Sequence, residues 1–136
     1  MKKTTMLRNL LKKPGFVSLP VVYDAMSARI AETVGFKALF MAVSAVSDAQ
    51  LGLPGIGLAT STEVIYWAKC IANSVNVPVI TNVDDGFGGA LGAFRTTEEL
   101  IRAGAAAMYL SDRKPVIPAG VPHNMLEVLP RAEYLG

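Results

Sequence analysis

Short apolar runs alternate with amphipathic stretches along this chain. The runs at 16–22, 38–43, 78–83 and 107–110 are typical of strands, and the second of them is apolar at every position. A strand without alternating polar residues is expected where both faces of a sheet are covered, as in parallel sheets. Pro20 belongs near the end of the first strand, because proline has no amide hydrogen to give to a sheet.

Capping residues and apolar spacing predict helices between these strands. Asp24 suits the N-cap of a helix that stops at Gly35. Thr60 and Glu63 have the spacing of a capping box, and the apolar residues after them share one helical face. That face contains Val64, Ala68, Ile71 and Val75.

A second capping-box pattern, Thr96 to Glu99, predicts the start of a helix that stops at Gly104. Pro130 suits the first turn of a further helix. At the other end, the basic and acid-free segment 2–13 is interpreted as a surface helix that leads into the first strand.

Alternating strands and helices place the chain in the α/β class, with a parallel sheet and right-handed crossovers. An open doubly wound sheet would favour a glycine-rich phosphate loop after the first strand, and the chain has none there; the glycines at 86–92 follow the third strand and miss the G-x-G-x-x-G spacing. A closed (β/α) barrel needs about 250 residues. We therefore expect one partial TIM-type barrel domain over 1–136, with about four strands: a fragment, an assembly-dependent half-barrel or an unusual open sheet.

Composition narrows the classes of partner. Thirteen basic and eleven acidic residues leave a net charge of +2, which gives no indication of nucleic-acid binding. No apolar run approaches the roughly 20 residues that cross a bilayer, so no membrane partner is expected. The single cysteine, Cys70, excludes an internal disulfide and fits a reducing compartment, so the expected location is the cytoplasm.

Polar residues gather where the predicted strands end, and this is where parallel barrels carry their working residues. Asn82 and Asp84 follow the third strand two positions apart, so their side chains should share a face. Ser111 and Asp112 end the fourth strand, and Gly55 lies in the loop after the second.

Four pieces of the chain, in order and spacing, resemble the isocitrate lyase and phosphoenolpyruvate mutase superfamily, which includes methylisocitrate lyases and carboxyphosphonoenolpyruvate mutases. The resemblance runs from about Leu7 to Asp112 and is to the N-terminal half of such a protein. The pieces are LRNLLKKPGFVSLPVVYDAMSARIAETVGFKALFMA, LGLPGIGLATSTEVI, PVITNVDDGFGG and RTTEELIRAGAAAMYLSD.

The resemblance implies a Mg²⁺-dependent barrel that acts on a small 2-oxo or hydroxy carboxylate. Members of the superfamily cleave or form a C–C bond, or a P–C bond in the mutases, through an enolate. A metal ion held by carboxylates would stabilise the developing enolate charge.

Several family positions are changed in this chain. The family motif D-x-D-x-G-[YF]-G has Asn82 in place of its first Asp and Asp84 as its second. Gly55 replaces the Asp of L-G-L-P-D, and Ser111 replaces the Glu of the Glu-Asp pair at the end of the fourth strand. The segment after that strand lacks the cysteine of the K-[KR]-C-G-H loop, and its one histidine is His123.

By resemblance, Asp84 is the predicted metal ligand; the alternative is a turn-forming aspartate before glycine. Ser44, in the segment that matches the family's carboxylate-cradling stretch, is predicted to contact the substrate together with Asn82 and Ser111. No catalytic residue is assigned. Asp85 is interpreted as turn chemistry. The two basic residues that follow Asp112 are interpreted as solvated loop charges, with pairing to an anionic substrate as the alternative.

Two functions follow from these observations. The first is a lyase or mutase of the superfamily, acting through an enolate. The alternative is a catalytically degenerate or truncated half-barrel that serves as a binding or assembly module. In both cases the open strand edges of a half-barrel should recruit a partner, so we expect a homo-oligomer.

Overall fold

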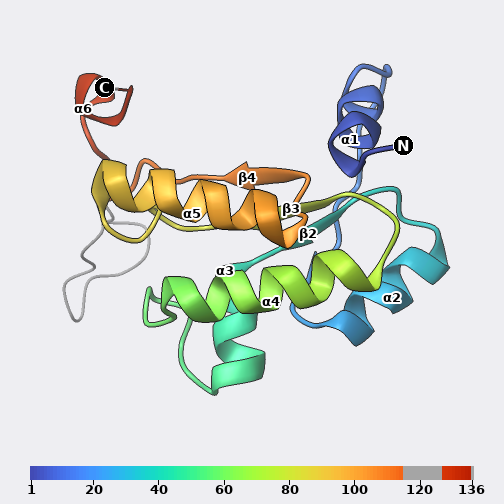
Figure 1. The fold of residues 1–136 in the computed structure, drawn as a ribbon, viewed down its shortest axis with the longest axis horizontal. Coiled ribbons are helices and arrows are strands. Elements are labelled where there is room, and N and C mark those ends of the chain that lie inside the picture. Colours follow the sequence, from blue (N-terminus) through green and yellow to red (C-terminus); the bar gives the residue numbers. More distant parts are fainter. Residues whose placement is uncertain (115–126, 136) are drawn as a thin grey trace.

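The computed structural model describes residues 1–114 and 127–135 and contains one sheet of four parallel strands in the order β1-β2-β3-β4 (Figure 1). No pairing joins β1 to β4 within these residues, so the sheet is not closed. The predicted α/β class with parallel (β/α) units is confirmed. The strands are β1 (Val21–Val22), β2 (Leu39–Met41), β3 (Val79–Asn82) and β4 (Ala107–Tyr109).

Three long helices, α2, α4 and α5, cover one face of the sheet (Figure 1). α1 lies beside the amino-terminal end of the strands and α6 beyond their carboxyl end. No helix in the described part of the chain is both long and apolar enough to cross a membrane. The helices are α1 (Lys3–Leu11), α2 (Ala25–Val34), α3 (Val43–Val46), the π-helix η1 (Ser47–Leu51), α4 (Ser61–Ser74), α5 (Gly89–Ala103) and α6 (Arg131–Leu135).

The hydrophobic core lies between the sheet and these three helices. Alternate strand residues point toward the helices, because side chains along a strand alternate between its two faces. Leu39, Met41 and Val79 are completely buried there. Burying an aliphatic side chain of this size contributes about 1.5 to 3 kcal/mol. Their helix partners in the core include Ala28, Val64, Ala68, Ile71 and Leu100.

The opposite face of the sheet is open and largely apolar. Val21 and Tyr109 are each 54% exposed there, although both belong to strands. Phe40 lies on the same face, and its ring meets that of Tyr109 edge to face with 6.1 Å between centroids. In a closed barrel this face would form the filled interior.

The structure confirms both predicted ends of α2 and the predicted start of α4, while Val75 lies just after α4 in an extended conformation. The Asp24 carboxylate accepts a hydrogen bond from the amide of Ser27 at 2.6 Å, and Gly35 ends α2 in a left-handed conformation with φ 107°. Thr60 and Glu63 form a reciprocal capping box at the start of α4. These signals are local, which is why the sequence alone was sufficient to find them.

The first strand is much shorter than the predicted 16–22. Only Val21 and Val22 pair with β2, and Phe16 is 92% exposed. Pro20 contributes its carbonyl, which accepts a hydrogen bond from the amide of Phe40 at 3.0 Å. Since proline has no amide hydrogen, regular pairing begins only after it.

The predicted helix start at Thr96 is wrong, because α5 begins at Gly89. Thr96 lies inside the helix, is buried, and donates its hydroxyl to the carbonyl of Gly86 at 3.1 Å. The earlier turns of α5 were hidden in the sequence because their large apolar residues face outward: Leu91 is 86% and Phe94 66% exposed. Helical periodicity reports a buried face, and these turns have almost none.

A lysine of the N-terminal segment caps the end of α4. The ammonium of Lys3 donates to the carbonyl of Ala72 and, at 2.7 Å, to that of Val75. These carbonyls lie at the C-terminus of α4, where unpaired acceptors and the helix dipole favour a cation. Burial lowers the pKa of Lys3, opposed in part by the charge of Glu32.

Replacement of Lys3 should destabilise the fold. Lys3→Met leaves the α4 carbonyls to water alone, and we expect a loss of about 1 kcal/mol in the free energy of unfolding. The matched control is Lys2→Met, which removes the same charge from an exposed neighbour. Equal denaturant midpoints for the two variants would contradict the capping role.

Candidate active site

The carboxyl end of β3 carries two polar side chains that hydrogen-bond to each other. The side-chain oxygen of Asn82 accepts from the amide of Asp84 at 3.0 Å, and the Asn82 amide group donates weakly to the Asp84 carboxylate at 3.4 Å. The two residues meet as expected, although β3 ends at Asn82 and strand alternation does not extend to Asp84. Asp84 has φ 47°, a left-handed conformation that aspartate tolerates better than most residues.

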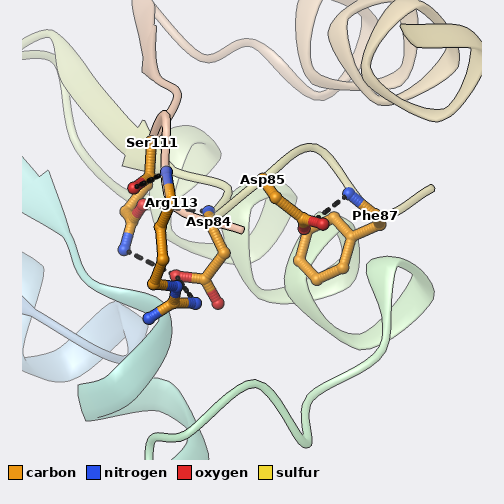
Figure 2. A network of polar contacts seen from close by, with 6 residues as sticks. Asp84, Asp85, Phe87, Ser111 and Arg113 are labelled. Atoms are coloured by element: carbon orange, nitrogen blue, oxygen red, sulfur yellow. Dashed lines mark hydrogen bonds and ion pairs between the residues drawn. The ribbon is translucent and has the colours of Figure 1, made fainter. Parts of the chain in front are cut away.

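The next residues form the turn from β3 into α5. The Asp85 carboxylate accepts from the amide of Phe87 at 3.1 Å, which closes the turn and confirms its predicted role (Figure 2). Gly86 has φ 90°, and a Cβ there would lie 2.7 Å from the Cβ of Ala93 in α5. The glycine-rich sequence therefore permits close packing between turn and helix.

The end of β4 joins the same cluster (Figure 2). The amide of Ser111 donates to the backbone carbonyl of Asp84 at 2.6 Å, and the hydroxyl of Ser111 accepts from the amide of Arg113 at 3.1 Å. The structure thus brings Asn82, Asp84 and Ser111 together as neighbours at one edge of the sheet, and adds Arg113 to them.

Arg113 faces Asp84 across this cluster (Figure 2). Its Nη2 lies 3.8 Å from the Asp84 Oδ1, and the two side chains are only 16% and 18% exposed. The interpretation of Arg113 as a solvated loop charge is therefore wrong, because the side chain is largely buried and faces the carboxylate of Asp84. Lys114 does behave as a surface charge and pairs with exposed Glu127.

Burial controls the protonation of Asp84. It raises the pKa of this carboxyl above its usual 3.8, and the Asp85 charge adds to the rise. Arg113 and the hydrogen bond from Asn82 act in the opposite direction but do not cancel the effect of burial. The net direction of the shift therefore follows from the burial of this carboxyl.

Ser44 lies apart from the hydrogen-bonded cluster, at the start of α3 after β2, and is exposed. The loop after η1 returns to it: a Cβ on Gly55 would lie 2.4 Å from the Ser44 Cβ and 2.6 Å from its Cα. Gly55 is the position where the family motif has an aspartate. In this backbone arrangement that side chain would have no space.

The remaining candidates add little to the site. Asp112 is exposed, and its carbonyl accepts from the amide of Leu129 at 2.7 Å. Cys70 is half-buried on α4, away from the cluster. His123 lies outside the described residues. Within the described residues no three His, Cys, Asp or Glu side chains are grouped as a metal site would need.

The fold and the cluster define the class of protein: parallel (β/α) units with a small polar site at the carboxyl end of the strands. The family described as phosphoenolpyruvate phosphomutase matches residues 7–132, and the chain belongs to this family, within the PEP mutase/isocitrate lyase superfamily. The predicted resemblance is confirmed.

Two curated relatives illustrate the match. The 2-methylisocitrate lyase of Halalkalibacterium halodurans is 39% identical over 107 residues, which are 79% of this chain and 35% of that protein. The 2,3-dimethylmalate lyase of Eubacterium barkeri is 35% identical over 137 residues, 100% of this chain and 47% of that protein. The chain therefore spans less than half the length of these two relatives.

Solved structures of similar proteins have the same fold over this part of their chains. Oxaloacetate acetylhydrolase in complex with the inhibitor 3,3-difluorooxalacetate superimposes with a TM-score of 0.89 at 34% identity, over 98% of this chain and 46% of that one. Phosphonopyruvate hydrolase in complex with oxalate and Mg²⁺ has a TM-score of 0.84 at 22% identity, over 98% and 45%. The second likeness shows the fold alone.

Because the pKa of Asp84 is raised, its ionisation should lower the free energy of unfolding as the pH rises. An acid whose folded pKa lies above its unfolded value binds more protons in the folded state, so its contribution to stability falls as pH rises from about 4 through the folded pKa. Asp84→Asn removes this term. The stability of the variant relative to the parent, measured by urea unfolding between pH 4 and 8, should therefore increase with pH. A flat difference would contradict the raised pKa.

Proposed function

We propose that this chain supplies the N-terminal half of a superfamily site that binds a small 2-oxo or hydroxy carboxylate, and that the site serves cleavage or formation of a C–C bond, or of a P–C bond, through an enolate. We further propose that 1–136 acts as one partial barrel domain. The family assignment supports the reaction class, since its named relatives are lyases and phosphomutases.

One observation carries the proposal: the polar side chains at the carboxyl ends of β3 and β4 form a connected cluster around a half-buried cation and carboxylate. An enolate develops negative charge on oxygen, and donors held in place before the reaction stabilise such charge best. Asn82 and Ser111 can offer an amide and a hydroxyl to substrate oxygens. Ser44, at the start of α3 after the neighbouring strand β2, is the third proposed contact.

Mg²⁺ is the cofactor that the family implies, and the residues described here fit it poorly. Mg²⁺ is held mainly by carboxylate charge and gives up its water reluctantly. Asp84 already faces the guanidinium of Arg113, and the carboxylate of Asp85 accepts from the amide of Phe87. Position 55 has no space for a second acid. The role of Asp84 as a metal ligand stays a prediction, and no step is assigned to the metal.

Oxalate tests the proposed function, because it imitates the enolate of pyruvate as a planar dianion. We expect millimolar oxalate to raise the melting temperature; a ligand at 100 times its dissociation constant adds about 2.7 kcal/mol of stability. Sodium chloride at equal ionic strength is the control. A further rise with Mg²⁺ that Asp84→Ala removes would support the metal-ligand prediction.

A cooperatively melting sample with no shift, with or without Mg²⁺, would contradict carboxylate binding. The second candidate function, a binding or assembly module without catalysis, would then be the better account. A specific observation favours it: one face of the sheet is open and apolar, and its edge strands β1 and β4 each pair on one side only within the described residues.

We propose that a second copy of this chain covers that face. A two-fold axis parallel to the strands would bring β4 of each copy beside β1 of the other, and all strands would remain parallel. Such pairing removes both free edges, which otherwise attract other chains.

Sedimentation velocity at micromolar concentration should therefore show a dimer or larger species. Tyr109→Asp places a charge on the open face, where the parent side chain is 54% exposed, and should shift the population toward monomer. Tyr66→Asp is the matched control, since Tyr66 is 59% exposed on α4, on the helical side. A parent protein that sediments as a monomer throughout would contradict the proposal.

A further inference from the structure

The guanidinium of Arg113 is buried beyond what its visible partners explain. Its Nε is inaccessible to solvent and has no hydrogen-bond acceptor among residues 1–114 and 127–135. Its Nη2 lies 3.8 Å from Asp84, which is an ion pair but too long for a direct hydrogen bond. A buried charged donor without an acceptor costs free energy, so this arrangement requires an explanation.

The backbone on both sides holds Arg113 in place. Its amide is bound by the hydroxyl of Ser111, and it forms an isolated antiparallel bridge with Val128. Next to it, the amide of Leu129 donates to the carbonyl of Asp112 at 2.7 Å. The side chain therefore starts from a fixed point at the end of β4 and reaches the cluster at the end of β3 (Figure 2).

A cation in this position competes with a metal ion. Mg²⁺ at Asp84 would lie close to a permanently charged guanidinium, and like charges repel strongly where water is scarce. The chain has also lost the acids that would offset a divalent charge: the family positions 55, 82 and 111 hold glycine, asparagine and serine. Asp85 is the second acid of the cluster, and its carboxylate accepts from the amide of Phe87. The guanidinium of Arg113 therefore already offsets part of the acidic charge that would hold a metal ion.

We propose that the guanidinium of Arg113 takes the place of the metal ion, and that it binds the carboxylate of the small acid directly. This inference rests on the proposed function and names the cation of that site. The planar guanidinium offers parallel N–H donors that match the two oxygens of a carboxylate. These donors would be the two Nη groups, because Nε is inaccessible to solvent. Asn82 and Ser111 are placed to contact the rest of such a ligand.

Isothermal titration with oxalate tests the inference, first in excess EDTA and then with Mg²⁺. We expect oxalate to bind in EDTA with an affinity that Mg²⁺ does not increase. Arg113→Met should weaken this binding by about 10- to 100-fold, as expected for a charged hydrogen-bonded pair. Arg113→Lys should recover part of the affinity for oxalate, because lysine restores the positive charge but not the parallel N–H donors of the guanidinium. Arg102→Met is the matched control, since Arg102 pairs with Glu99 on the exposed face of α5.

The outcomes separate this inference from the proposed function. Oxalate binding that appears only with Mg²⁺, or that survives in Arg113→Met, would overturn the role of Arg113 and leave carboxylate binding intact. The comparison of EDTA with Mg²⁺ uses the parent chain, so it decides the question even if a variant fails to fold. No binding of oxalate, pyruvate or malate in either condition would overturn the proposed function itself.

Discussion

Parallel pairing of β2 with β3 and of β3 with β4 determines which side chains meet in this protein. Parallel strands end at the same edge of the sheet, so the residues after β3 and β4 are neighbours although they are distant along the chain. The backbone continues this contact beyond the strands, because the amide of Ser111 binds the carbonyl of Asp84. The approach of Arg113 to Asp84 depends on this alignment.

Features that depend on a few adjacent residues could be predicted from the sequence. Asp24 and Thr60 cap their helices through neighbours three positions away, and Asn82 and Asp84, two positions apart, hydrogen-bond to each other. The start of α5 could not be found in this way. The helix is held there by Thr96 reaching back to Gly86, a tertiary contact, while its apolar residues face outward.

The contact between Asp84 and Arg113 could be predicted from the sequence only in part. Each residue could be placed at a strand end, but their approach depends on the direction that Arg113 takes after β4. One signal was available: a basic residue directly follows the Ser-Asp that ends the fourth strand, where the chain has lost a family acid. The loss of an acid and the inward-facing cation act in the same direction, because each makes the site less negative and therefore less able to hold a metal ion.

The ion pair of Asp84 and Arg113 forms within this chain, without a closed barrel. Asp84 and Arg113 are largely shielded from solvent even though the sheet is open on its other face. The two side chains are therefore shielded without a second set of (β/α) units over the open face. A second set of (β/α) units over the open face would exclude more water and strengthen the interaction between these charges. The pair of Asp84 and Arg113 already exists without those additional units. Carboxylate binding by this pair can therefore be measured on the chain alone.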